Sequence, residues 1–77
     1  MRSVLNPVLS PDGRKLVFVA AGYLWEQPVD GGSAQRLFNG GALENWPAFS
    51  PDGKKLAFVR SEYGREEVRV LDRKSVV

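Results

Sequence analysis

The sequence predicts an all-β protein built from two similar antiparallel sheets. Three observations lead to this prediction. Residues 7–20 recur almost unchanged at 47–60, each copy contains a Pro-Asp-Gly turn, and no apolar segment keeps helical spacing over the ~10 residues that a helix needs. Short segments rich in Val, Phe, Leu and Tyr, divided by five prolines and eight glycines, are instead typical of strands and turns.

The repeat is close and contains no gap. Aligned at an offset of forty, "PVLSPDGRKLVFVA" and "PAFSPDGKKLAFVR" agree at nine of fourteen positions. Repeats of about forty residues occur in β-propeller blades and in helical-hairpin arrays. In Pro-Asp-Gly the proline fixes φ at the first corner of a turn and the glycine accepts a positive φ. The turns and the strand-like composition therefore favour the propeller.

The first copy is predicted to supply four strands. They cover residues 7–10, 14–20, 23–29 and 33–39, and are separated by Pro-Asp-Gly, Ala-Gly and Asp-Gly-Gly turns. A loop at 40–45 is expected to lead into the second copy. That copy supplies strands at 46–50, 54–60 and 65–72, with a loop at 61–64, and has no fourth strand of its own.

The alternation of side chains supports a stack of sheets. Leu16 and Phe18 point to one face of their strand, and Val17 and Val19 point to the other. Both faces are apolar, and the second copy repeats this pattern. A strand that is apolar on both faces is covered on both faces. Small sheets packed face to face in a radial array, as in a β-propeller, produce this burial.

Two segments of the chain carry a family resemblance. "FSPDGKKLAFVR" and "YLWEQPVDGGSAQRL" resemble the WD-like repeat of TolB-type propellers, which also occurs in propeller domains of prolyl-oligopeptidase-type peptidases, tricorn-like proteases and amidohydrolases. The resemblance covers nearly the whole chain. It implies two four-stranded blades, but it implies little about function because such propellers carry many activities. The rings of this family have many more than two blades.

Two consequences concern the missing strand and the missing blades. Residues 2–6 are predicted to act as an outer clasp strand, with the first blade at 7–39, a three-stranded second blade at 46–72 and a tail at 73–77. The alternative is that both ends fray. Because two blades cannot close a ring, we expect three or four chains to form a six- or eight-bladed homo-oligomer. The alternative is a fragment of a longer propeller.

The amino-acid composition limits the kinds of chemical function expected of this chain. The chain has no histidine and no cysteine, so we expect no catalytic residue, no metal site and no cofactor. Its net charge is +2 with both signs interspersed, which favours a solvated surface over a nucleic-acid interface. No apolar stretch is long enough for a membrane span. Without a signal peptide the chain is expected to be cytoplasmic as written, or periplasmic if a leader was removed.

The repeated Asp12 and Asp52 are interpreted as turn residues that bind nearby backbone amides. The candidate binding site follows from the resemblance, which implies that the loops before the first strand and after the second strand of a blade open at one mouth of the channel. The expected site residues are Trp46, Asn45, Glu44, Asn6, Arg60, Tyr63 and Tyr23. Asn6 is taken as the counterpart of Asn45, and Tyr23 as that of Tyr63. The alternatives are that Trp46 packs in the core, as Trp25 is expected to do, and that Arg60 and Tyr63 belong to a solvated loop.

Three functions remain open from the sequence. The first is a non-catalytic binding or scaffold module that recognises a protein or peptide at the channel mouth. The second is a fragment of the propeller domain of a peptidase or amidohydrolase whose catalytic domain lies elsewhere. The third is a relic or engineered two-blade unit that only assembles. No nucleophile motif such as Gly-x-Ser-x-Gly is present in the sequence.

Overall fold

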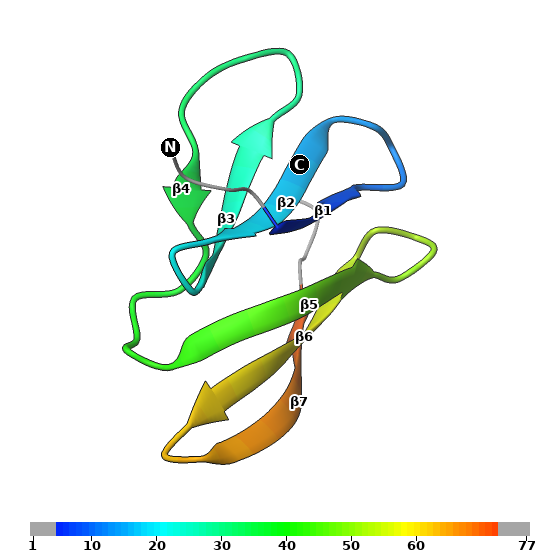
Figure 1. Cartoon of the computed structure of the whole chain (residues 1–77). Helices are drawn as coiled ribbons and strands as arrows, with labels where there is room; N and C mark the ends of the chain where they lie inside the picture. Colours follow the sequence, from blue (N-terminus) through cyan, green and yellow to red (C-terminus); the bar gives the residue numbers. More distant parts are fainter. Residues whose placement is uncertain (1–4, 73–77) are drawn as a thin grey trace.

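The computed structural model describes residues 5–72, which form two antiparallel sheets (Figure 1). The strands are β1 Leu5–Leu9, β2 Lys15–Ala20, β3 Tyr23–Pro28, β4 Gln35–Arg36, β5 Leu43–Phe49, β6 Lys55–Glu62 and β7 Arg65–Asp72. The first sheet has the order β1-β2-β3-β4 and the second the order β5-β6-β7. The predicted all-β class is confirmed, as is the difference of one strand between the copies. Within residues 5–72 no helix is long and apolar enough to cross a membrane.

Several predicted boundaries were wrong, and hairpin pairing explains most of the differences. The strand expected at 33–39 is reduced to Gln35–Arg36, because the residues that follow leave the sheet to pack on the core. In the second sheet, β5 begins at Leu43 and β6 continues to Glu62, so both expected loops are shorter. Leu43 pairs with Ser61, so cross-strand pairing continues beyond the predicted strand ends.

In each sheet, one tight turn connects the second and third strands. Ala21 and Gly22 have φ of 54° and 84°, and Tyr63 and Gly64 have φ of 53° and 74°. Two consecutive positive φ values define a type I′ turn, whose twist matches that of the strands it joins. The β6–β7 hairpin is longer than the β2–β3 hairpin, and this places Tyr63 at its tip.

The Ser-Pro-Asp-Gly turns have the same hydrogen bonds in both copies. The Ser10 hydroxyl donates to Oδ1 of Asp12 at 2.7 Å and accepts the Lys15 amide at 3.0 Å, while Oδ1 also accepts the Arg14 amide at 3.0 Å. The second copy repeats these contacts around Asp52. Hydrogen bonds from the serine hydroxyl and then from the backbone amide lower the pKa of each aspartate below its ordinary value of 3.8. The interpretation of both residues as turn residues is confirmed.

The first strand of each sheet also shows the same irregularity. Register shifts between Leu5 and Val8 in β1, and between Asn45 and Ala48 in β5, so each strand carries a bulge next to its proline. Proline cannot donate to the ladder, and a bulge accommodates it. Leu5 pairs with Val19 of β2, so the end of the proposed clasp strand belongs to β1. Residues 2–4 of that strand and the tail at 73–77 lie outside the described residues.

The core lies between the two sheets. Its buried members are Val17, Val19, Leu24, Leu56 and Phe58. Burying each large side chain of this kind contributes about 1.5–3 kcal/mol. Phe38, which follows β4, reaches across to Phe58 with ring centroids 4.8 Å apart. Residues after the short fourth strand therefore tie the first sheet to the second.

The sheets use opposite faces of the repeat in this contact. The first sheet contributes Val17 and Val19, whereas the second contributes Leu56 and Phe58, which align with Leu16 and Phe18. The packing is therefore head to tail rather than face to equivalent face. The predicted assignment of these four β2 side chains to two faces agrees with the pairing of Phe18 with Trp25 and of Val19 with Leu24.

Candidate functional site

The residues expected on a loop before the second copy lie in strand β5. Glu44 pairs with Arg60 and Asn45 pairs with Val59, so both belong to the β5–β6 ladder. Strand β5 lies beside the first sheet and contacts β1, β2 and β3 (Figure 1). The expected loop site is therefore a strand that joins the two sheets.

Glu44 has a structural role in this junction. Its side chain is only 5 % exposed, and Oε1 accepts the Leu24 amide at 2.7 Å. The Glu44 amide donates to the Gly22 carbonyl at 2.9 Å. A buried backbone N–H without an acceptor is costly, and a carboxylate is a strong acceptor. Glu44 thus links β5 to the β2–β3 hairpin.

Trp46 is presented outward at the bulge of β5. Its side chain is 64 % exposed, and its φ is 54°, in the left-handed region. Oδ1 of Asn45 accepts the Trp46 amide at 2.8 Å. Left-handed backbone costs about 1–2 kcal/mol for a residue with a Cβ. With this exposure, Trp46 does not pack between the two sheets of this chain.

Trp25 behaves differently. It is half-buried on β3, and its indole Nε1 donates to the Ala20 carbonyl at 3.0 Å. Buried tryptophans commonly satisfy the indole N–H in this way. Trp25 is therefore packed on its own sheet, although it is not part of the central core.

The structure corrects both expected counterparts in the first copy. Leu5 faces Val19 as Asn45 faces Val59, so Asn6 corresponds to Trp46 and not to Asn45. Tyr23 begins β3, whereas Tyr63 lies within a turn, so these tyrosines are not equivalent. The Arg36 guanidinium lies 3.7 Å from the centre of the Tyr23 ring, and the tyrosine is half-buried. Such a cation–π contact holds both side chains against the sheet.

Tyr63 and Arg60 do not share a loop. Tyr63 occupies the tip of the β6–β7 hairpin and is 94 % exposed. Arg60 lies within β6, between Glu44 of β5 and Glu67 of β7. The solvated-loop alternative fits the exposure of Tyr63 but not the position of Arg60. Exposed aromatic side chains are suited to recognition because they offer a large contact area at low entropic cost.

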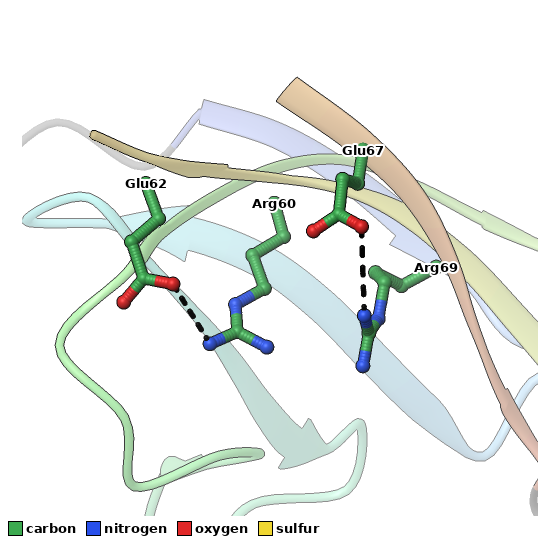
Figure 2. Close-up of polar contacts among 4 residues, drawn as sticks. All are labelled: Arg60, Glu62, Glu67 and Arg69. Atoms are coloured by element: carbon green, nitrogen blue, oxygen red, sulfur yellow. Dashed lines mark hydrogen bonds and ion pairs between the residues drawn. The ribbon is translucent and has the colours of Figure 1, made fainter. Parts of the chain in front are cut away.

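A row of charged side chains lies on the face of the second sheet that carries Phe58 (Figure 2). Arg60 pairs with Glu62 at 3.4 Å, and Arg69 pairs with Glu67 at 3.8 Å. Figure 2 shows both arginine side chains extending from the same side of the sheet. Since these groups are at least one-third exposed, each pair contributes little to stability.

A cavity of about 200 Å³ adjoins this row. Its lining includes Phe38, Glu44, Phe58, Arg60 and Arg69. Sequence reasoning found only Glu44 and Arg60 of this group, because the others come from separate elements. The sequence does hold one indication of the charged row. Opposite charges stand two residues apart at positions 60 and 62 and at 67 and 69, and residues two apart lie on the same face of a strand.

The chemistry offered by the site is hydrogen bonding, ion pairing and aromatic contact. Across residues 5–72, no group of three or more His, Cys, Asp or Glu side chains is placed to hold a metal ion. The strongest outward features are the two aromatic residues, Trp46 and Tyr63, both on the second sheet. A comparison with protein-family models found no match, and neither did a search of curated proteins.

Proposed function

We propose that this chain is a non-catalytic binding module of the β-propeller type, in which the two sheets act as two blades. Two similar meanders packed face to face, and the resemblance of their turns to TolB-type repeats, support this proposal. The module recognises a protein or peptide through the exposed aromatic residues of the second sheet. Trp46 is the main anchor and Tyr63 is the peripheral contact.

The conformation of Trp46 is the observation that carries the proposal. A large apolar side chain is held 64 % exposed on a bulged strand, with its amide bound by the preceding asparagine. The exposed indole contributes little to folding, and the left-handed backbone opposes it. A bulge re-aims a side chain, and bulges are enriched beside functional sites. A tryptophan presented outward at a bulge is well suited to be a binding anchor.

Selection from a phage-displayed peptide library against the purified chain tests this function. We expect enriched peptides to bind Trp46→Ala at least ~30-fold more weakly, because a binding anchor contributes about 2 kcal/mol or more. Val29→Ala is the matched control, since Val29 is also an exposed apolar residue, at 53 %, but lies after β3. Equal affinities for wild type and Trp46→Ala would rule out the anchor role.

A further inference from the structure

Each sheet has one face that the other sheet leaves uncovered. In the first sheet, the Leu9 face comprises Leu9, Leu16, Phe18, Ala20, Tyr23, Trp25, Gln27 and Arg36, as the strand register pairs them. In the second sheet, the Val68 face comprises Leu43, Asn45 and Ala48 of β5 together with Lys55, Ala57, Val59, Ser61, Glu66, Val68, Val70 and Asp72. The buried core occupies the opposite face of each sheet.

The Val68 face repeats a surface that is buried elsewhere in the same chain. Ala57 and Val59 align with Val17 and Val19 at the offset of forty. Val68 corresponds to Leu24, because Leu24 lies opposite Val19 and Val68 lies opposite Val59. Leu24 is fully buried in the contact between the sheets, whereas Val68 is 75 % exposed and Val70 is 60 % exposed.

The Leu9 face has the complementary relation. Leu16 is half-buried, while its equivalent Leu56 is fully buried against the first sheet. Leu9 is 55 % exposed and also belongs to this face. Phe18 is already buried, so the uncovered apolar surface comes from the two leucines and from the half-buried aromatic residues. The uncovered Val68 face is thus equivalent, in the repeat, to the face that the first sheet uses in the contact between the sheets. The uncovered Leu9 face is equivalent to the face that the second sheet uses in the same contact.

Charge also matches across these faces. Arg36 is the charged member of the Leu9 face. The Val68 face carries the carboxylates of Glu66 and Asp72 against the ammonium of Lys55, which leaves one net negative charge. Opposite charges on facing surfaces favour encounter and fix orientation. Each uncovered face of one copy therefore has a counterpart on a second copy, with an equivalent apolar surface and the opposite net charge.

We propose that copies of this chain associate head to tail, with the Leu9 face of one copy bound to the Val68 face of the next. Such a contact is heterologous, so each copy keeps one unused face until the assembly closes on itself. Closure into a ring gives the six or eight sheets of three or four chains. The contact buries exposed valines and leucines, which otherwise form an aggregation-prone surface.

Mutants on the two faces test this polarity. Val68→Asp places a charge in the Val68 face, and Leu9→Asp places one in the Leu9 face. The control Ser33→Asp adds the same charge at an exposed loop position away from the β6–β7 ladder. Light scattering on a sizing column gives the mass of each. We expect wild type and Ser33→Asp at three or four times the 8.5 kDa chain mass, and each face mutant at one chain mass.

The decisive sample is the equimolar mixture of the two face mutants. It should form a dimer of two chain masses, because one intact Leu9 face meets one intact Val68 face and growth stops there. A monomeric wild type, a face mutant that keeps the wild-type mass, or a mixture that stays monomeric would overturn the proposal. Circular dichroism confirms that each variant is folded, and Val70→Asp replaces Val68→Asp if it is not. The peptide selection reports separately on the binding function.

Discussion

The left-handed backbone at Trp46 predicts an unusual order of stability between two substitutions. Trp46→Ala and Trp46→Gly both remove the indole, and both keep the amide that Asn45 accepts. They differ only in the Cβ atom. At a φ of 54° this atom crowds the backbone, whereas glycine adopts the conformation freely.

The expected difference follows from two opposing terms. Relief of the left-handed strain favours glycine by about 1–2 kcal/mol. The larger entropy of glycine in the unfolded chain disfavours it by about 0.5–1 kcal/mol relative to alanine. Trp46→Gly should therefore be more stable than Trp46→Ala by about 0.5–1 kcal/mol. This order is the reverse of that at an ordinary strand position.

Urea unfolding followed by circular dichroism measures this difference, at one chain concentration because association shifts stability. Ala48→Gly is the control, since Ala48 is an exposed residue of β5 without a positive φ. There glycine should lower the unfolding free energy by about 0.5–1 kcal/mol. The reasoning fails if glycine is as unfavourable at position 46 as at position 48. Peptide binding should be lost in both Trp46 variants.

Three further predictions follow from the turns and the junction. Glu44→Ala should lower the unfolding free energy by about 1–3 kcal/mol in urea titrations, because a buried amide loses its acceptor, while Glu44→Gln should cost less; equal losses would contradict this role. Gly22→Ala and Gly64→Ala should both lower the thermal midpoint, and by similar amounts, since both have positive φ and the Leu43 atom that a Cβ at Gly22 would meet at 2.8 Å ends an exposed side chain that can move; a much larger loss at Gly22 would contradict this. Because folding lowers the pKa of Asp12 and Asp52, their contribution to stability is present above the unfolded value of 3.8 and is lost as the pH falls through the folded value. The urea midpoint should therefore fall as the pH is lowered from about 5 to below 3.8, and less steeply in the Asp12→Asn/Asp52→Asn double mutant; identical pH profiles would contradict it.

The features predicted correctly from the sequence are those fixed by local chemistry. The Ser-Pro-Asp-Gly turn contains its own hydrogen-bond donors and acceptors, so its role can be deduced from the neighbouring letters. Apolar alternation assigned Val17 and Phe18 to opposite faces because strand geometry has a period of two. The forty-residue offset then predicted a second sheet of the same kind.

The incorrect predictions concern contacts between distant segments. Glu44 was expected on a loop, but its partner is a backbone amide twenty positions away, which no local pattern reveals. Tyr63 was paired with Tyr23 because both follow the second strand, yet the longer β6–β7 hairpin breaks that equivalence. For Trp46 a weak signal existed. The aligned residue is Asn6, and asparagine tolerates left-handed backbone better than most residues.

The use of opposite faces in the sheet contact has a consequence for how such a chain can change length. In this contact, one face of a sheet binds the opposite face of the next sheet. Duplication of a forty-residue segment therefore adds a sheet that can use the same contact with its neighbours. No new complementary surface has to arise by mutation. Gene duplication can therefore lengthen this architecture one sheet at a time, and the number of sheets per chain can vary while the contact between them stays the same.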